Sequence, residues 1–177
     1  MFNVLIMKTL TGLFILFAVL GGLSTANAQS SKKERNAAKA AAVTKMINDI
    51  NYVFEANTAN PQRGGQKQLT SEYDLKVTKD TVIAFLPYFG RAYLAPDPGT
   101  TEGGIKFTTT NFSYSSKQSK NGNWNILIKP KDKNMTNWRD VEQLILNISA
   151  DGYALLQVIS THRDPISFNG YIQEVKN

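Results

Sequence analysis

Cysteine is absent from this sequence of 177 residues, and histidine occurs only once, as His162. Without cysteine the chain has no disulfide, no thiolate nucleophile, no thiolate metal ligand and no residue that a lipobox lipid anchor requires. A lone histidine is also a poor basis for a metal site, which normally combines several imidazole or thiolate ligands. We therefore predict no metal site, no cofactor and no catalytic residue.

The sequence also lacks the short motifs that mark common enzymes. No serine stands in a Gly-x-Ser-x-Gly turn, and any serine triad would depend on His162 as its base. Gly103-Gly104 is too short to cradle a phosphate, and no acidic loop has the spacing that calcium requires. The carboxylates occur mainly at predicted turns, so a hydrolase with an acid pair is only the third hypothesis.

Positive charge is unevenly distributed along the chain. The 20 lysines and arginines exceed the 14 acidic residues, which gives a net charge of +6. Much of this excess lies in one predicted helix, at Lys32, Lys33, Arg35, Lys39 and Lys45. We favour an ordinary solvated helix face, while contact with anionic lipid or an acidic partner is the alternative. No recognition motif accompanies the charge, so nucleic acid is not an expected partner.

The N-terminal segment has the three zones of a secretory signal peptide. Lys8 supplies the positive charge, Leu10 to Leu20 form the apolar run, and small residues occur at 26 and 28. We predict cleavage between Ala28 and Gln29, which releases a soluble, unlipidated chain into the periplasm or outside the cell. Either Met1 or Met7 is the start. The alternative is an uncleaved membrane anchor, because the apolar stretch counted from Val4 approaches the length of a spanning helix.

The chain after the signal peptide begins with a predicted amphipathic helix. Ser30-Ser31 followed by Glu34 has the form of a capping box, and the helix is expected to end near Asn51. Its apolar residues recur at spacings of three and four, which predicts one stripe that is buried against another element. The stripe comprises Ala38, Ala42, Val43, Met46, Ile47 and Ile50.

The rest of the chain consists of short strand candidates separated by turn residues. They are Tyr52–Thr58, Tyr73–Thr78, Thr81–Leu86, Gly90–Ala95, Gly104–Thr110, Asn111–Ser116, Asn123–Lys129, Glu142–Ile148, Tyr153–Thr161 and Ile166–Val175. The links between them are too short for parallel crossovers. We predict an α+β fold of one domain, residues 29–177. Its helix packs on a strongly curved antiparallel β-meander of about 8–10 strands, a half-barrel or open barrel.

A family resemblance rests on several segments that occur in order along the chain. The first is Leu86-Pro87-Tyr88-Phe89-Gly90-Arg91-Ala92-Tyr93-Leu94-Ala95-Pro96, followed by Gly103 to Phe107, Trp124 to Ile126, Ile148 to Ala154, Val158 to Ser160 and Arg163 to Gly170. Together they resemble domain of unknown function 4251, a family of exported proteins found mainly in Bacteroidetes. The resemblance implies a secreted helix-plus-sheet protein and assigns no activity.

Four residues are candidates for ligand binding: Tyr88, Arg91, Tyr93 and Arg163. An arginine between aromatic rings can hold a carboxylate or a sugar-like ligand by forked hydrogen bonds and stacking. The structural alternative, which we favour, is that Gly90 permits close packing while the arginine and the rings stabilise the fold.

The composition favours a non-enzymatic binding or carrier module of the bacterial cell envelope. Its expected ligand is small and apolar or amphipathic, held on the concave side of the sheet, and the expected state is a monomer. The alternative is a structural or interaction protein that docks on an envelope protein through the basic helix or an open sheet edge.

Overall fold

The structure is a computed structural model, and it describes residues 31–93, 104–132 and 141–175. The chain divides into two compact units, Met1–Ala38 and Lys39–Asn177. The predicted signal peptide, with its cleavage site between Ala28 and Gln29, lies outside the described residues. Within the described ranges, no helix is long and apolar enough to cross a membrane.

The predicted helix is confirmed and spans residues 31–49. Its second half belongs to the unit that contains the sheet, and there Val43 and Ile47 are buried in the hydrophobic core. Ala42, which the predicted stripe included, is exposed, so the buried stripe is narrower than the spacing indicated. Ile50 ends the helix with a left-handed φ of 47°, and the Asn51 amide donates to the Met46 carbonyl over 3.0 Å.

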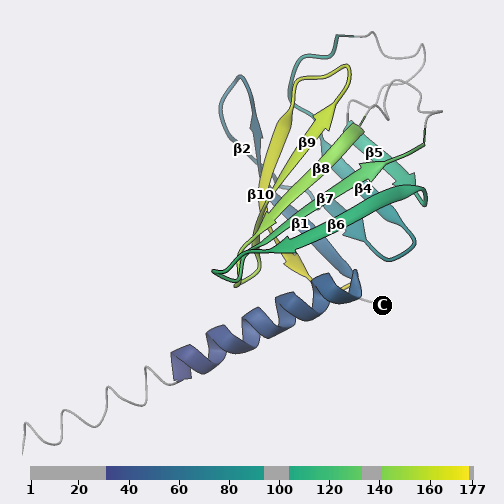
Figure 1. The fold of residues 1–177 in the computed structure, drawn as a ribbon. Helices are drawn as coiled ribbons and strands as arrows, with labels where there is room; N and C mark the ends of the chain where they lie inside the picture. The colour runs from purple at the N-terminus through teal and green to yellow at the C-terminus, as the bar shows by residue number, and fades with distance from the viewer. Residues whose placement is uncertain (1–30, 94–103, 133–140, 176–177) are drawn as a thin grey trace, which may run out of the picture. The chain divides into compact units, whose positions relative to one another are not determined.

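Ten strands follow in the described chain, and Figure 1 shows them wrapped into a curved sheet. They are β1 (Tyr52–Pro61), β2 (Lys67–Gln68), β3 (Asp74–Val77), β4 (Val82–Pro87), β5 (Gly104–Thr109), β6 (Phe112–Gln118), β7 (Trp124–Pro130), β8 (Val141–Ile148), β9 (Tyr153–Ser160) and β10 (Ile166–Gln173). All the pairings are antiparallel, as predicted.

The sheet consists of two meanders joined edge to edge. Its strand order is β5-β4-β3-β1-β10-β9-β8-β7-β6, with β2 pairing beside β1. The first and last strands of the sheet unit, β1 and β10, pair at the centre, while β5 and β6 form the two ends of the path. The central pairing joins residues that are more than a hundred positions apart, so local sequence patterns contain no signal for it.

A short link between the two end strands explains the curvature. Only Thr110 and Asn111 separate β5 from β6, although these strands lie at opposite ends of the path. The sheet must therefore curl until its ends come within reach of two residues, and it forms a nearly closed barrel (Figure 1). The Thr109 hydroxyl fixes this corner by hydrogen bonding to the Asp132 carboxylate, and the Lys131 amide donates to the Asn111 carbonyl over 2.8 Å.

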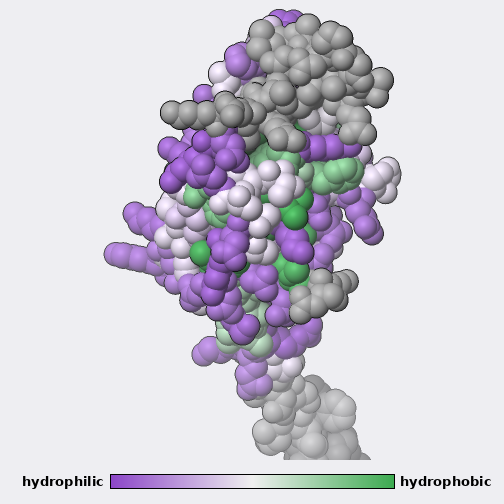
Figure 2. Space-filling view, turned by 90° about the vertical axis from the view of Figure 1, so that its right-hand side faces the viewer, coloured by the Kyte–Doolittle hydropathy of each residue, from purple (hydrophilic) through white to green (hydrophobic). Residues whose placement is uncertain are grey.

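The concave face of the sheet is filled by side chains. Alternate residues of the strands point inward and form one buried cluster, whose largest members include Phe54, Phe168, Leu75, Leu144 and Ile126. The opposite side of each strand faces outward, as period-two alternation requires. On the side of the sheet that carries β5 and β6, small apolar areas interrupt a mostly hydrophilic surface (Figure 2).

Two tyrosines meet inside the barrel. Tyr52 of β1 is fully buried, and its pKa is raised well above the ordinary value, first by burial and then by the neighbouring Tyr114 phenol of β6. Burial also raises the pKa of Tyr114. Neither phenolic oxygen makes a hydrogen bond of good geometry in the described chain, although the two hydroxyls are close enough to affect each other's pKa. Because β1 is central and β6 is terminal in the path, this contact across the interior reflects the closure of the barrel.

Most strand predictions are confirmed, but two local expectations were wrong. The segment predicted as a strand from Gly90 forms only an isolated bridge at Ala92, and its last two residues lie outside the described chain. The reason is that β4 ends at Pro87, after which the chain leaves the sheet. The strand β2 was missed because two polar residues, Lys67 and Gln68, carry no alternation signal.

Candidate functional site

The four residues predicted to bind a ligand come together in one contact between two segments of the chain. Residues 91–93 lie antiparallel to residues 162–164, with a bridge between Ala92 and Arg163. The Tyr93 amide donates to the His162 carbonyl over 2.8 Å, and the Asp164 amide donates to the Arg91 carbonyl over 3.0 Å. We call this contact of residues 88–93 with 162–164 the cross-tie.

Arg163 is the buried centre of the cross-tie. It is 5 % exposed, donates from Nη1 to the Gly104 carbonyl over 3.1 Å, and lies 5.2 Å above the Tyr88 ring. The Tyr88 hydroxyl lies 2.9 Å from the Arg91 carbonyl oxygen and 3.1 Å from that of Asp164. These contacts tie the end of β4 and the start of β5 to the turn after β9.

The remaining two candidates differ in how they contribute. The Tyr93 hydroxyl donates to the Asp164 carboxylate, and this hydrogen bond raises the pKa of Tyr93. Arg91 contributes its carbonyl to the cross-tie while the residue is exposed. Gly90 has the role that the structural alternative gave it, because a Cβ there would lie 2.5 Å from the Tyr88 hydroxyl. Tyr88, Tyr93 and Arg163 therefore use side-chain polar atoms in contacts within the protein, whereas the Arg91 side chain is exposed and Tyr93 is 61 % exposed.

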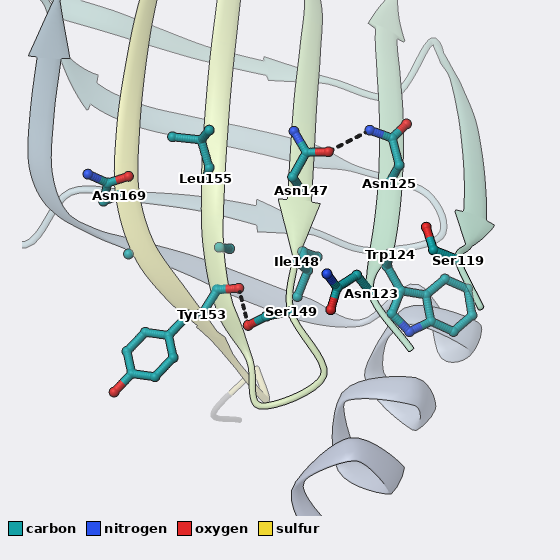
Figure 3. A pocket seen from close by; sticks show the side chains of 12 residues that line it. Ser119, Asn123, Trp124, Asn125, Asn147, Ile148, Ser149, Tyr153, Leu155 and Asn169 are labelled. Carbon is teal, nitrogen blue, oxygen red and sulfur yellow. Dashed lines mark hydrogen bonds between the residues drawn. The ribbon is translucent and has the colours of Figure 1, made fainter. Parts of the chain in front are cut away.

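A groove on the outward face of β7–β10 is a better candidate for a binding site (Figure 3). It has a volume of about 470 Å³ and lies between two rows of side chains that cross the strands. Strand register places one row directly in line: Asn125, Asn147, Leu155 and Asn169. The second row contains Ser119, Asn123, Ser149 and Tyr153. The floor between them is the backbone of Trp124, Ile148, Ala154 and Gly170, which pair across the same strands.

Two similar hairpin turns position the second row. Residues 119–123 read Ser-Lys-Asn-Gly-Asn and residues 149–153 read Ser-Ala-Asp-Gly-Tyr. In each turn the first amide donates to the fifth carbonyl over 2.8 Å, and the glycine amide donates to the serine carbonyl over 3.0 Å. Gly122 and Gly152 have φ values of 85° and 94°, which a side chain would strain. These turns are the predicted antiparallel links.

Hydrogen bonds inside the groove fix three of its polar side chains. Asn125 donates from Nδ2 to Oδ1 of Asn147 over 2.7 Å, and the Ser149 hydroxyl lies 2.9 Å from the Tyr153 carbonyl oxygen (Figure 3). The first bond leaves the Asn125 amide oxygen as an acceptor and the Asn147 amide nitrogen as a donor at the surface. The groove is therefore preorganised to bind a ligand that both donates and accepts hydrogen bonds.

No lining residue of the groove carries a charge, although the chain has a net charge of +6. The side chains that face outward are asparagines, serines, one leucine and one tyrosine. Tyr153 is 67 % exposed and Leu155 is 39 % exposed, so both present apolar surface beside the amides. This lining suits a neutral polar ligand with some apolar surface.

The nearest arrangement to an acid pair lies elsewhere on the outward face. Glu55 of β1 is directly opposite Asp74 of β3, and Gln173 donates to the Glu55 carboxylate over 2.9 Å. Burial raises the pKa of Asp74, the positive charge of Lys76 opposes that shift, and the negative charges of Glu55 and Glu72 add to it. Neither Glu55 nor Asp74 lines the groove. In the described ranges, no three acidic or histidine side chains form a group that could hold a metal ion.

Sequence reasoning missed the groove because its residues converge only through strand register. A signal was nevertheless present, since asparagine is depleted in strands and still occupies outward positions at 125, 147 and 169. Residues with poor strand propensity, in strands with a clear alternation of apolar and polar residues, indicate a role other than stabilising the sheet.

Comparisons with known proteins support the fold and the family resemblance. A crystal structure of a DUF4251 family protein from Bacteroides eggerthii is similar to this chain, with a TM-score of 0.55 and 16% sequence identity. The similar region covers 77% of this chain and 88% of the Bacteroides eggerthii chain. At that identity the likeness concerns the fold alone. No curated protein matches this chain. The model of the domain of unknown function DUF4251 matches residues 34–172, and the chain therefore belongs to this family.

Proposed function

We propose that this protein is an exported, non-enzymatic binding module of the periplasm or cell exterior, and that its ligand lies in the groove across β7–β10. The observation that carries the proposal is the convergence of four asparagines and an exposed tyrosine on one uncharged depression. Export rests on the three zones of the N-terminal sequence.

The filled interior favours the outward face over the concave face as the ligand site. Phe54, Phe168 and Leu144 are each fully buried there, together with the rest of the core. A ligand between them would have to displace packed side chains, and removing one such residue typically costs about 2–5 kcal/mol. The expected apolar or amphipathic ligand is thereby replaced, in this proposal, by a polar one on the opposite face.

The chemistry of the lining favours binding over catalysis. General acid–base catalysis needs a group whose pKa lies near the working pH. The outward side chains of the groove are amides, hydroxyls and an aliphatic group, together with the Tyr153 phenol. These groups hold and orient a ligand. The Ser149 hydroxyl hydrogen-bonds to the Asp151 carboxylate and to the Tyr153 carbonyl, contacts that belong to the turn at residues 149–153, and no histidine or lysine of the described chain lines the groove to serve as a base.

A variant that fills the groove tests this function. Leu155→Trp places an indole in the middle of the first row. Asn111→Trp is the control because Asn111 is exposed in the link between β5 and β6 and does not line the groove. Thermal unfolding of residues 29–177 is measured with a library of sugars, fatty acids, amino acids and nucleotides. A ligand at a hundred times its dissociation constant adds about 2.7 kcal/mol of stability.

We expect at least one compound to raise the unfolding temperature of the wild type and of Asn111→Trp by several degrees, with no effect on Leu155→Trp. The bound compound is recovered chemically unchanged. Conversion of that compound by the wild type would contradict a non-enzymatic role. An equal response from Leu155→Trp would remove the groove as the site.

The alternative of a docking protein has one supporting observation. In the path of the described sheet, β6 is an end strand and pairs only with β7, and its residues from Ser115 to Gln118 are exposed. A photoreactive residue in place of Ser116 should crosslink one envelope protein in cells if this alternative holds. Crosslinking that Leu155→Trp leaves unchanged would favour the edge of β6 over the groove.

A further inference from the structure

We propose that the groove across β7–β10 recognises an uncharged oligosaccharide about three sugar rings long. This inference rests on the proposed function, because it names the class of ligand for the same groove. It joins four observations: the missing charge, the asparagine row, the exposed Tyr153 ring and the length of the groove.

The missing charge excludes the ligands that depend on ion pairs. A phosphate, a sulfate or a uronic acid is normally bound by arginine or lysine. Two lysines lie nearby, Lys117 of β6, opposite Asn125, and Lys120 in the turn at residues 119–123, and neither lines the groove. A ligand with a formal charge would therefore lose hydration in the groove without gaining a counter-charge.

The asparagine row matches the chemistry of sugar hydroxyls. Each hydroxyl both donates and accepts a hydrogen bond, and an asparagine amide offers two donors and an acceptor in one plane. The bond between Asn125 and Asn147 holds the two amides in one orientation and leaves donor and acceptor positions free for a ligand. Asn169 of β10, which is opposite Leu155 of β9, offers the same amide donors and acceptor.

Tyr153 and Leu155 supply surface for the apolar faces of sugar rings. A pyranose ring carries its C–H groups on its two faces, and these pack on aromatic and aliphatic side chains. Tyr153 is held by the turn at residues 149–153, so its ring is presented with its backbone already ordered. In Figure 3 the Tyr153 ring stands at the β9–β10 end of the groove, away from the Asn125–Asn147 pair.

The length of the groove fits a short chain of sugars. Adjacent strands lie about 4.8 Å apart, so the first row spans about 14 Å from β7 to β10. That distance matches an extended trisaccharide. Each sugar ring would then span about the distance between two adjacent strands and lie next to their amide or aliphatic side chains.

A peptide or a lipid fits the same surface less well. A peptide gains much of its affinity by adding a strand to a free edge, but the floor of the groove is backbone already paired within the sheet. A fatty chain would leave the asparagine amides and the serines without partners, because Leu155 and Tyr153 are the main apolar groups that face it.

The test is isothermal titration of residues 29–177 with a fixed panel. The neutral probes are maltotriose, cellotriose, mannotriose and triacetylchitotriose, while trigalacturonate and decanoate represent charged and apolar ligands. Probes are used at about 10 mM, which detects dissociation constants in the millimolar range. We expect at least one neutral trisaccharide to bind and neither charged nor apolar probe to do so.

Three variants locate the binding. Tyr153→Ala should weaken the neutral trisaccharide about tenfold because it removes the stacking surface. Asn147→Asp keeps the shape of the side chain but replaces its two donors with a negative charge, and should weaken binding about fivefold or more. Asn111→Ala, an exposed asparagine outside the groove, should change the affinity less than about twofold.

The outcomes separate this inference from the proposed function. If decanoate or trigalacturonate binds and Tyr153→Ala abolishes that binding, the groove is the ligand site but the oligosaccharide is wrong. If no neutral trisaccharide binds, the inference is overturned. If a trisaccharide binds equally to the wild type, Tyr153→Ala and Asn147→Asp, both the inference and the placement of the site are overturned.

Discussion

The cross-tie and the groove lie at opposite ends of β9, and both combine tyrosine with hydrogen-bonding side chains. In the cross-tie, the buried Arg163 and the Tyr88 hydroxyl make their contacts within the protein. In the groove, the asparagine amides and the Tyr153 ring face outward, and only some of their capacity is used by neighbours. Residue type alone therefore does not distinguish a structural cluster from a binding surface, whereas burial and hydrogen-bond partners do.

The largest expected effect is at the centre of the cross-tie. Arg163→Ala removes a buried guanidinium that bonds to the Gly104 carbonyl and packs on Tyr88, and we expect the free energy of unfolding to fall by about 3 kcal/mol. Urea unfolding measures this change. Arg91→Ala is the matched control because Arg91 is exposed, and it should cost less than about 0.5 kcal/mol. Equal losses in the two variants would show that the cross-tie does not depend on Arg163.

The second effect lies on the floor of the groove, where one residue is structural. A Cβ at Gly170 would lie 1.9 Å from the Glu55 carbonyl oxygen, next to the bulge between Ala56 and Thr58. Gly170→Ala must therefore displace β1 from β10, and we expect a loss of about 2 kcal/mol. The unfolding temperature of Gly170→Ala is compared with that of Ser167→Ala, a control variant on the same strand. A stable Gly170→Ala protein would mean that this pairing tolerates a shift.

The third effect has the opposite sign and concerns a buried polar atom without a well-formed hydrogen bond. Tyr52→Phe removes a phenolic oxygen that makes no hydrogen bond of good geometry in the described chain and lies beside the Tyr114 hydroxyl. We expect stability at neutral pH to be unchanged or higher by up to about 1 kcal/mol. A loss like that expected for Arg163→Ala would show that the Tyr52 hydroxyl is bonded.

The same residue predicts a pH dependence. Folding raises the pKa of Tyr52, so the protonated phenol contributes stability that is present below the pKa of the unfolded chain. That stability is lost as the pH rises from the ordinary tyrosine pKa toward the raised one. Denaturant unfolding across the alkaline range should therefore show a shallower decline for Tyr52→Phe than for the wild type, and identical declines would contradict the assignment.

The smallest effect on stability is expected in the asparagine row. Asn125→Ala and Asn147→Ala each break one exposed hydrogen bond, so unfolding should change by no more than about 0.5 kcal/mol. The variants should nevertheless lose affinity for a groove ligand. A large loss of stability in either variant would show that the asparagine row stabilises the fold, as the cross-tie does, and would argue against a binding surface.

Local patterns predicted much of the fold because most strands show their own alternation of apolar and polar residues. Trp124, Ile126 and Ile128 alternate with outward residues, and β7 lies where that alternation placed it. The helix was similarly marked by its spacing. In contrast, Gly90 to Ala95 were expected to form a strand, but Tyr88 turns back onto Gly90 and residues 91–93 pair only with residues 162–164.

The groove was beyond local reasoning for a physical reason. Asn125, Asn147 and Asn169 come from three strands. The register that aligns them depends on the pairing of β7 with β8, on the turn at residues 149–153 between β8 and β9, and on the pairing of β9 with β10. A shift of one residue in any of these pairings would turn an asparagine to the buried face. Sequence spacing therefore marks these residues as unusual without showing that they meet.

The most direct test of the groove as an oligosaccharide site is a nitrogen-15 NMR titration of residues 29–177 with the neutral trisaccharide that binds best. The account predicts that the side-chain amide signals of Asn125, Asn147 and Asn169 shift with one common dissociation constant, while backbone signals of residues 88–93 and 162–164 stay in place. Shifts in the cross-tie segments with unmoved asparagine amides would contradict it.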